Sequence, residues 1–407
     1  MEIDLDDSQM LALASRLSSA GPKVGGIVGP PGAGKTATLA QEISEAVTAR
    51  GERVLMCAGQ NATVDQTLLI VEAILKERGL PYNVIKRTGN ISKSSEDIVG
   101  RFATHKRDEL SRARVVFTTF HSSYVATGEP VLSRGDFDRL AFDETGQATP
   151  EQAWIPLELL DSDPTSKVTV YGDDRQLLPF TPDYVKEKGV LRYLRENRAP
   201  NVTQLDTSYR LPDGGVDMTS HIWYNGLLDS PSEVRARRLK LTTTSSGRYR
   251  EVVDPENTLV YVGVNSREAD SGLSHDNPGQ SRITAEIVSD LIACGVGSRR
   301  ILVMAPYRPH VNSLNLALNG TGVEASTVHR RLGAENDVVI FSTTRSNANM
   351  AWGIAAQPEL WNVATSRERM KLIIVGDSGT TFSEGSRVTK LVYDFVEKHG
   401  RTVHVSI

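Results

Sequence analysis

Residues Gly29 to Thr36 read GPPGAGKT, and they follow an apolar run from Val24 to Val28. The pattern G-x-x-x-x-G-K-[ST], placed after a strand and before a helix, predicts a phosphate-binding loop. Its glycines let backbone N–H groups close around phosphates, and the helix N-terminus adds positive potential. We expect Lys35 to reach the outer phosphates and Thr36 to ligate Mg²⁺. The alternative is a Gly/Pro turn that ends in Lys-Thr, and the flanking strand and helix patterns argue against it. The sequence therefore predicts nucleoside triphosphate binding.

A second apolar strand ends in an acidic pair, Asp143 and Glu144, within FDRLAFDETGQ (residues 137–147). The carboxyl end of a strand is where an open α/β sheet places ligand chemistry. Asp143 is predicted to hold the metal, and Glu144 to act as the general base on the attacking water. An ordinary acidic pair between strand and loop is the alternative. A third strand, residues 167–171, runs into GDDRQLLP (172–179), where Gln176 is placed to sense the terminal phosphate through a neutral amide.

Six blocks occur in one order: GPPGAGKT, DETGQA, GDDRQLLP, TSYR, TVHRRLGAENDVV and NVATSRERMKLIIVGD. This order resembles the superfamily 1 helicases, and within them the 5′→3′ branch that includes the nonsense-mediated-decay RNA helicase. The matching segments run from about residue 5 to residue 377. The resemblance implies two tandem RecA-like P-loop domains, each a mostly parallel α/β sheet flanked by helices. It also implies ATP and Mg²⁺ as cofactors and an ATP-dependent helicase or translocase that acts on single-stranded RNA or DNA, with RNA favoured and movement 5′→3′.

The resemblance implies roles for individual residues. Gln9 is expected to read adenine, Tyr209 to stack on the base and Glu335 to accept from the ribose hydroxyls. Arg210 and Arg367 are expected on the terminal phosphate, where a forked guanidinium neutralises spread negative charge. The catalytic set is then Lys35, Asp143, Glu144, Gln176, Arg210 and Arg367. The nucleotide-binding set is Gln9, Gly29, Pro30, Pro31, Gly32, Ala33, Gly34, Lys35, Thr36, Tyr209 and Glu335, with Thr36 and Asp143 on the metal.

Contacts with the nucleic acid are expected at the ends of other strands. The resemblance points to Asn61, Thr63, Thr118, Thr119 and Thr327. Turn and cap roles are the alternative for these polar side chains. Separately, Arg369, two residues on from Arg367 along an expected helix, is predicted to be an ion-pair partner.

Two positions depart from the family pattern. Leu332 stands where the family usually has a glutamine before the glycine of the Gly-x-Glu triplet, here Gly333. The loss of that amide is expected to weaken coupling between nucleotide and nucleic acid. His310 stands where relatives often carry a glutamine.

The charge balance restricts where nucleic acid binds. With 46 basic and 50 acidic residues the net charge of the 407-residue chain is −4, so any binding groove must be a local basic stripe. Two clusters are candidates, and a solvated surface is the alternative for each. They are Arg235, Arg237, Arg238, Lys240, Arg248 and Arg250, and Lys93, Arg101, His105, Lys106, Arg107, Arg112 and Arg114.

The remaining composition narrows the class of protein. Cys57 and Cys294 lie far apart inside apolar runs, which predicts buried thiols rather than a disulfide or a zinc site. There is no run of 18 apolar residues and the N-terminus is acidic, so we expect neither a membrane span nor a secretory signal. An intracellular monomer, cytoplasmic or nuclear, is expected.

The pattern of apolar segments predicts two domains, residues 1–205 and 206–407, with a polar basic stretch at 230–256 in the second. An amphipathic helix is expected over residues 62–78 and another helix over 281–293. Apolar runs predict strands in TLVYVGV, ILVMAPY, DVVIFSTT and KLIIVGD. Two other classes of function stay open: a nucleic-acid clamp that unwinds little or nothing, and a P-loop ATPase acting on protein. The motifs of the second half argue against the latter.

Overall fold

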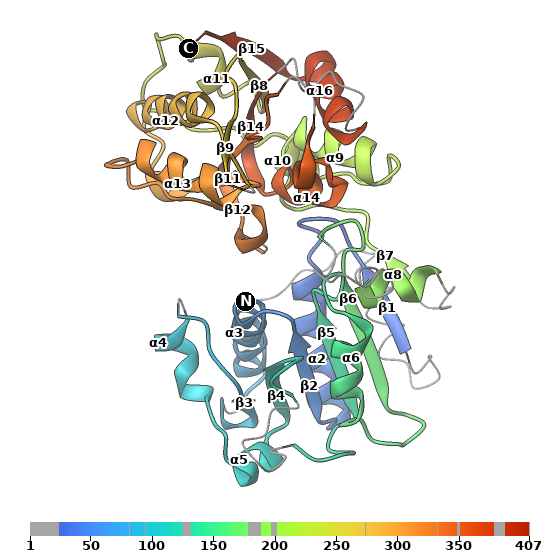
Figure 1. The fold of residues 1–407 in the computed structure, drawn as a ribbon. Helices are drawn as coiled ribbons and strands as arrows, with labels where there is room; N and C mark the ends of the chain where they lie inside the picture. Colours follow the sequence, from blue (N-terminus) through green and yellow to red (C-terminus); the bar gives the residue numbers. More distant parts are fainter. Residues whose placement is uncertain are drawn as a thin grey trace. The chain divides into compact units, whose positions relative to one another are not determined.

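The computed structural model describes residues 24–80, 82–93, 95–123, 132–177, 189–196, 202–272, 274–331, 333–347, 351–377 and 387–406. The chain divides into two compact units, Met1–Asp206 and Thr207–Ile407. Each unit has its own sheet and its own helices (Figure 1). In the described part of the chain no helix is long and apolar enough to cross a membrane.

The first unit is built on a parallel sheet, whose seven described strands have the order β3-β4-β2-β5-β6-β1-β7. The strands are β1 (Val24–Val28), β2 (Val54–Ala58), β3 (Ile85–Arg87), β4 (Val115–Thr119), β5 (Arg139–Asp143), β6 (Lys167–Gly172) and β7 (Val202–Gln204). Their helices are α2 (Lys35–Arg50), α3 (Asn61–Glu77), α4 (Glu96–Val99), α5 (Arg107–Arg112), α6 (Pro150–Leu157) and α8 (Gly189–Glu196). Because all these strands are parallel, their carboxyl ends meet at one edge of the sheet.

Helices α2 and α3 form because each carries an apolar face. In α3 the predicted stripe of Val64, Leu68, Val71 and Leu75 is buried, which confirms the amphipathic pattern. Helix α2 ends where Gly51 adopts φ 68°, a left-handed cap that glycine takes easily. The two helices pack side by side and, with β1, β2 and β4, enclose an apolar cluster of buried side chains.

The second unit repeats this architecture with six described strands in the order β12-β11-β13-β14-β8-β15. They are β8 (Leu259–Val264), β11 (Ile301–Ala305), β12 (Ala325–Thr327), β13 (Asn336–Ser342), β14 (Glu368–Gly376) and β15 (Arg401–Val405), all parallel. A hairpin of β9 (Ala269–Ser271) and β10 (Ser274–Asp276) stands apart. The helices are α9 (Gly215–Trp223), α10 (Ser232–Arg235), α11 (Arg250–Val253), α12 (Pro278–Ala293), α13 (Arg308–Ala317), α14 (Pro358–Ala364) and α16 (Arg387–His399), with the 3-10 turns η3 (Ser298–Arg300) and η4 (Val328–Arg331).

The predicted strands and the α/β class are confirmed, but one local prediction is wrong. A helix was expected through Arg367 and Arg369, whereas α14 ends at Ala364 and β14 begins at Glu368. The hydroxyls of Thr365 and Ser366 donate back to carbonyls of α14, which ends the helix. The apolar run that follows is then drawn into the middle of the sheet as a buried strand.

Candidate functional site

The phosphate loop leaves β1 at Val28 and enters α2 at Lys35. Gly32 and Gly34 have φ values of 76° and 73°, a region that glycine adopts without the Cβ clash of other residues. The Lys35 ammonium donates to the carbonyl of Gly29 at 2.8 Å and to that of Pro30 at 3.2 Å. The loop is therefore closed around its own lysine, and this ammonium is the charge that phosphate oxygens would meet.

The two predicted metal ligands lie together although 107 residues separate them: Thr36 Oγ1 donates to Asp143 Oδ2 at 3.3 Å. They meet because β6 pairs with both β1 and β5, so the loops after these strands share one edge of the sheet. A hydroxyl and a carboxylate oxygen are the hard ligands that Mg²⁺ prefers, with phosphate and water completing the shell. The donor set therefore fits magnesium.

Asp143 is only 1% exposed. Burial raises its pKa to about 7, and the neighbouring Glu144 carboxylate adds to the rise. The Glu144 N–H, Lys35 and Thr36 act in the opposite direction. A divalent cation beside this oxygen would favour the ionised carboxylate, so the chemistry of the position also suits a metal ligand.

Glu144 has a left-handed backbone with φ 52°. Such a conformation is uncommon outside glycine, and residues held in it cluster at functional sites. The following turn imposes it: the N–H and the hydroxyl of Thr145 both donate to the Tyr171 carbonyl of β6, at 3.0 and 2.8 Å. Glu144 is half-buried, and within the described residues its carboxylate has no hydrogen bond or ion pair. A carboxylate fixed in place but uncommitted is suited to general base chemistry.

Gln176 lies in the loop after β6 at the same edge of the sheet. Its amide donates to Asp173 Oδ2 at 2.8 Å, and the Arg175 N–H donates to the other Asp173 oxygen at 3.0 Å. Both Gln176 and Asp173 are buried. Asp173 thus fixes the amide beside the strands that carry the phosphate loop and the acidic pair.

One buried carboxylate, Glu42 of α2, connects the elements that carry these residues. Its Oε1 accepts from Arg139 at 2.7 Å and from Thr169 at 2.8 Å, and its Oε2 accepts from the Tyr171 hydroxyl at 2.5 Å. Arg139 begins β5, and the other two partners belong to β6. Sequence reasoning missed Glu42; the available signal was an acidic residue beside Ile43 on the apolar face of the expected helix.

The comparisons with known proteins agree with this geometry. An Arabidopsis thaliana DNA replication ATP-dependent helicase/nuclease is 28% identical over 87% of this chain and 27% of its own length. A DNA polymerase alpha-associated DNA helicase A of Saccharomyces cerevisiae is 26% identical, with 97% and 68% covered. A regulator of nonsense transcripts 1 homolog of Neurospora crassa is 26% identical, with 92% and 37% covered. Two family profiles, both described as an AAA domain, match residues 4–95 with 82–182 and residues 187–379.

The chain belongs to the superfamily 1 helicases. It spans 27% to 68% of the length of the three relatives named above. A solved structure of a Saccharomyces cerevisiae Dbp5 variant bound to a Gle1 variant and IP6 shares the fold, with a TM-score of 0.51 at 11% identity. That likeness covers 99% of this chain and 89% of that chain. Two RecA-like units are thus present, as predicted.

Arg210 and Glu335, both of which were expected to contact the nucleotide, form an ion pair with each other inside the second unit. Arg210 Nε donates to Glu335 Oε2 at 2.5 Å, and Arg210 also donates to the Ser366 carbonyl at 3.1 Å. Arg369 donates to the other Glu335 oxygen at 2.9 Å, as expected of an ion-pair partner. Burial opposes ionisation of Glu335, but the two arginines outweigh it and hold its pKa below the usual value.

The second predicted arginine finger of the helicase is also held in place. Arg367 is 3% exposed, and its Nε donates to the Val363 carbonyl at 3.1 Å. Tyr209, expected to stack on the base, is 38% exposed. Tyr209 is therefore much more exposed than the two arginines, Arg210 and Arg367, whose side chains lie largely inside the second unit.

Among the predicted nucleic-acid contacts, Asn61 and Thr63 lie in the first turn of α3 and Thr327 ends β12; all three are partly exposed. Asn61 Oδ1 accepts from the buried Arg87 at 2.9 Å, which orients the amide nitrogen away from that partner. Thr118 and Thr119 lie at the end of β4 and are buried, with exposed fractions of 0% and 8%. A contact of either side chain with nucleic acid stays a prediction.

Several arginines and lysines of the two candidate basic clusters have acidic partners. Arg235 donates to Asp213, Asp217 and Asp229 at 2.8–2.9 Å. The three carboxylates more than balance the single positive charge of its guanidinium. Arg238 pairs with Glu256 at 3.4 Å. In the first unit, Arg101 pairs with Glu72 and Lys106 with Glu109. These clusters are partly ion-pair networks, and charge counting along the sequence did not reveal the acidic partners.

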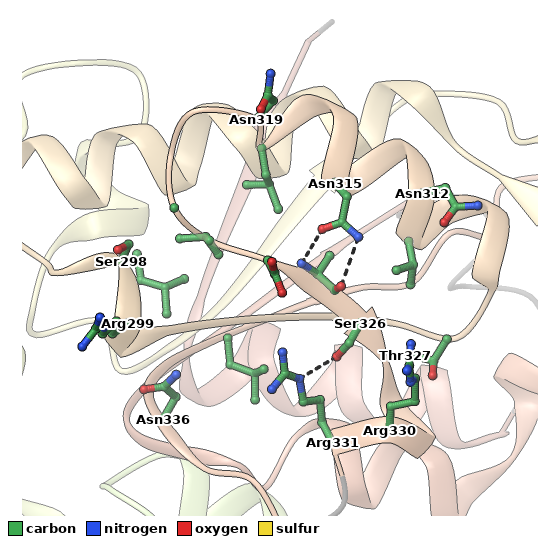
Figure 2. Close-up of a pocket in the computed structure, with 18 of the residues that line it drawn as sticks. Ser298, Arg299, Asn312, Asn315, Asn319, Ser326, Thr327, Arg330, Arg331 and Asn336 are labelled. Atoms are coloured by element: carbon green, nitrogen blue, oxygen red, sulfur yellow. Dashed lines mark hydrogen bonds between the residues drawn. The ribbon is translucent and has the colours of Figure 1, made fainter. Parts of the chain in front are cut away.

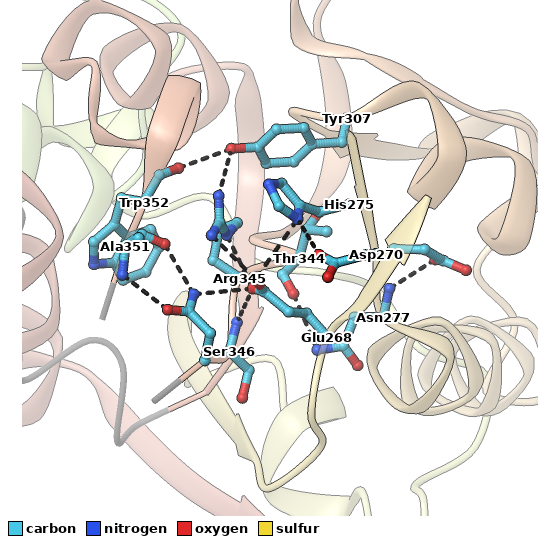
Figure 3. Close-up of polar contacts among 12 residues, drawn as sticks. Glu268, Asp270, His275, Asn277, Tyr307, Thr344, Arg345, Ser346, Ala351 and Trp352 are labelled. Carbon is cyan, nitrogen blue, oxygen red and sulfur yellow. Dashed lines mark hydrogen bonds and ion pairs between the residues drawn. The ribbon is translucent and has the colours of Figure 1, made fainter. Parts of the chain in front are cut away.

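A buried polar network fixes the turn after β13 in the second unit (Figure 3). Thr344 has φ 71°, which is rare for a β-branched residue. Its N–H donates to Gln280 Oε1 at 2.8 Å, and its carbonyl accepts from Asn277 at 3.0 Å. The next residue, Arg345, donates to both oxygens of Glu268, at 2.9 and 3.0 Å. Side chains from α12 and its N-cap therefore hold this strained turn.

His310, the second departure from the family pattern, is a fully buried neighbour of that network. Its Nε2 lies 2.7 Å from Ser342 Oγ and its Nδ1 lies 3.0 Å from Asp276 Oδ1. Burial lowers the pKa of His310, against the pull of Asp276, so a neutral ring with one donor and one acceptor replaces the usual amide.

The remaining observations concern the two cysteines, a group of possible metal ligands and two positions that lie outside the described residues. Cys57 and Cys294 are free and buried, as expected. Glu268, Asp270 and His275 bring ligand atoms within 4.8 Å of one another, but the two bonds from Arg345 already neutralise Glu268. Gln9 and Leu332 lie outside the described residues.

Proposed function

We propose that the chain hydrolyses ATP with Mg²⁺ and uses the cycle to translocate along single-stranded nucleic acid and to unwind adjoining duplexes. One observation carries this proposal: Thr36 Oγ1 lies 3.3 Å from Asp143 Oδ2, and Glu144 follows with an uncommitted carboxylate. A metal position and a general base at the same strand end are what phosphoanhydride hydrolysis requires.

Each residue has a defined task in this proposal. The Lys35 ammonium exchanges the carbonyls of Gly29 and Pro30 for phosphate oxygens. Bound magnesium, held by Thr36 and Asp143, supplies charge neutralisation on the phosphates. Glu144 takes a proton from the attacking water, and Gln176 responds to the presence of the terminal phosphate.

The second unit supplies the charges that complete hydrolysis. Arg210 and Arg367 are proposed to stabilise the negative charge that spreads over the transferring phosphoryl group, and Glu335 to accept from the ribose. Because Arg210 and Glu335 pair at 2.5 Å, they would act as one group rather than two. Release of the terminal phosphate would then change the state of both units, which is how such motors step.

The polymer is proposed to be a single strand that meets Asn61, Thr63 and Thr327, with movement 5′→3′. Binding of this kind relies on backbone contacts and tolerates many sequences. The names of the relatives include two DNA helicases and one regulator of nonsense transcripts, so ribose and deoxyribose strands both belong in the test.

The deciding experiment measures ATP hydrolysis without nucleic acid, with a ribo-homopolymer and with a deoxyribo-homopolymer, beside strand displacement on matched tailed duplexes. Stimulated hydrolysis together with displacement is the expected result, and the stronger of the two stimulations identifies the sugar. If nucleic acid stimulates ATP hydrolysis but no strand is displaced, the chain is a nucleic-acid clamp and not a helicase. Leu332 favours this alternative. If neither polymer changes the rate of ATP hydrolysis, the result would favour the other alternative, an ATPase that acts on protein.

A further inference from the structure

A cavity of about 1230 Å³ runs along β12, the edge strand of the second sheet (Figure 2). Helix α13 bounds it on one side and η4 on the other. It exceeds the range of about 300–1,000 Å³ that is usual for small-molecule sites. Its lining residues include four asparagines but no aromatic side chain. These features suit a polar, extended ligand rather than a stacked ring.

The charge of the lining is strongly positive. Arg299, Arg308, Arg330 and Arg331 face the cavity, and Glu324 is the one acidic residue among the lining side chains. The lining therefore carries a net charge of +3 in a chain whose net charge is −4. A concave surface of one sign concentrates ions of the other. The ligand is expected to be an anion with several charges.

These arginines also lack the partners that other arginines of the unit have. Arg210, Arg235 and Arg345 are each bound to carboxylates. In contrast, the side chains of Arg299, Arg308 and Arg330 make no hydrogen bond or ion pair to any described residue. Arg331 is bound only to the neutral Ser326 hydroxyl, at 2.9 Å, as Figure 2 shows. Four positive charges of one cavity are thus left without a counter-charge from the described protein.

Arg308 adds an electrostatic argument of its own. It is the first residue of α13, where the helix dipole is positive, and the first turn holds no acidic residue. The N-cap residue Tyr307 supplies no side-chain hydrogen bond. A cation at this end is unfavourable by itself, and an anion bound there would offset both charges.

The backbone N–H and carbonyl of Ala325, the first residue of the edge strand β12, are already hydrogen-bonded to a side chain, so a peptide could not pair with them. Asn315 accepts from the Ala325 N–H at 2.8 Å and donates to the Ala325 carbonyl at 3.2 Å. The cavity therefore offers charged side chains, not an open strand edge. This favours a phosphate-bearing ligand over a peptide that would extend the sheet.

We propose that the cavity binds the phosphodiester backbone of the nucleic-acid strand beyond Thr327. The inference rests on the proposed function, because Thr327 is both an expected contact and a lining residue. Arg299 lies just before β11, and Thr327 pairs with Ala305, the last residue of β11. Arg299 and Thr327 therefore lie toward opposite ends of β11, which is about 13 Å long. The strand follows the edge of the second unit, and its successive phosphates meet several arginines.

The test uses the full chain and labelled single-stranded ribo- and deoxyribo-oligonucleotides of about 6 to 20 nucleotides, with affinity measured by fluorescence anisotropy at several salt concentrations. The variant is Arg299→Ala with Arg330→Ala. The matched control is Arg267→Ala with Arg387→Ala, which removes two exposed arginines that have no side-chain partner among the described residues, do not line the cavity and belong to neither candidate basic cluster. Thermal unfolding of both variants verifies that the fold is kept.

We expect the cavity variant to lose about 5-fold in affinity per arginine at about 0.1 M salt, and so about 25-fold for the longest strands. Its salt dependence should fall by about 1.4 in slope, because each phosphate contact on a single strand contributes about 0.7. The shortest oligonucleotides and the control variant should keep wild-type affinity.

Equal affinity of the cavity variant and the wild type for long strands would overturn the proposal. Loss of tripolyphosphate or polyglutamate binding with unchanged oligonucleotide binding would also overturn it, in favour of a free polyanion or an acidic protein segment. A wild-type chain that binds no oligonucleotide of any length would instead overturn the proposed function itself.

Discussion

Arg210 and Glu335 are 125 residues apart in sequence, yet Arg210 Nε donates to Glu335 Oε2 at 2.5 Å. Each was expected to serve the nucleotide separately, one on the terminal phosphate and one on the ribose. In the structure the guanidinium is held by a carboxylate and by the Ser366 carbonyl. A phosphate that binds Arg210 must therefore either share the guanidinium with these two partners or displace them. The action of Arg210 then depends on the position of Glu335, the expected ribose contact.

Replacement of either predicted arginine finger should lower the rate of ATP hydrolysis much more than the affinity for ATP. A guanidinium on the terminal phosphate stabilises charge mainly in the transition state. Single fingers are worth about 10³–10⁵ in rate, so Arg210→Ala and Arg367→Ala should each cost less than that if they share the charge. Steady-state kinetics with saturating single strands would measure both effects.

The double variant should fall short of the product of the two single losses, since both groups act on one charge. Arg369→Ala is the matched control, because Arg369 also binds Glu335 but is half exposed. Full strand-stimulated turnover in Arg367→Ala would contradict the assignment.

Lys35→Ala should abolish hydrolysis and also remove the stabilisation of the fold by ATP. Among the described residues the Lys35 side chain bonds only the loop carbonyls of Gly29 and Pro30, so the variant should fold normally. In the wild type, ATP at about 100 times its dissociation constant should add about 2.7 kcal/mol of stability. Thermal shift with and without ATP-Mg²⁺ would detect the loss, and the exposed Lys76→Ala serves as control. Normal turnover in Lys35→Ala would argue against the ATPase assignment.

Glu144→Gln should bind ATP normally and hydrolyse it at least about 10²-fold more slowly, as expected for loss of a general base. The amide keeps the size of the side chain and leaves Asp143 and Thr36 in contact, so the metal position should persist. ATP affinity and single-turnover rates would separate binding from chemistry. A large loss of ATP affinity would show that Glu144 is a ligand instead.

Glu42→Ala should destabilise the first unit by up to about 3–5 kcal/mol, because it leaves the buried Arg139 with Glu52 as its remaining described carboxylate partner and removes two further hydrogen bonds. Glu45→Ala on the same helix is the matched control, since its exposed pair with Arg78 is worth at most about 1 kcal/mol. Denaturant unfolding would measure both. Equal effects of the two variants would mean that the network does not hold the site together.

Glu368 should make stability decrease with rising pH. Burial raises the pKa of this carboxyl from 4.5 to about 8, against the pull of Arg210 and Arg367, and neither oxygen has a hydrogen-bond partner among the described residues. The unfolded chain loses the proton first, so the folded state should lose stability between about pH 4.5 and 8. Glu368→Gln should reduce this decline in denaturant unfolding at a series of pH values, and the part that remains below about pH 7 is expected from Asp143, whose pKa burial raises from 3.8 to about 7.

Lys371 gives a control of opposite sign. Burial lowers the pKa of its ammonium from 10.5 to about 7, so stability should rise between about pH 7 and 10.5, and Lys371→Met should remove that rise. An unchanged decline at lower pH in Glu368→Gln would show that another group is responsible.

The parts of the site that are local in sequence were the predictable ones. Lys35 and Thr36 follow from one loop pattern, and Asp143 from the end of one apolar strand. The pairing of Arg139 with Glu42, across 97 residues, needed the three-dimensional sheet order. The burial of Thr118 also could not be predicted without the sheet order, because the sequence of a central strand that is covered on both faces shows no polar, exposed face. The ion pairs of Arg235 could not be predicted either, since its three acidic partners are scattered over residues 213 to 229.

The amide of Asn315 has a consequence for self-association. Its two hydrogen bonds to Ala325 fill the position that a neighbouring peptide would take, so the sheet stops at a side chain instead of an unpaired strand. Open strand edges invite pairing between copies of a chain, and proteins block them at such places. Selection on this residue would then act through protection from aggregation, independently of any role in catalysis.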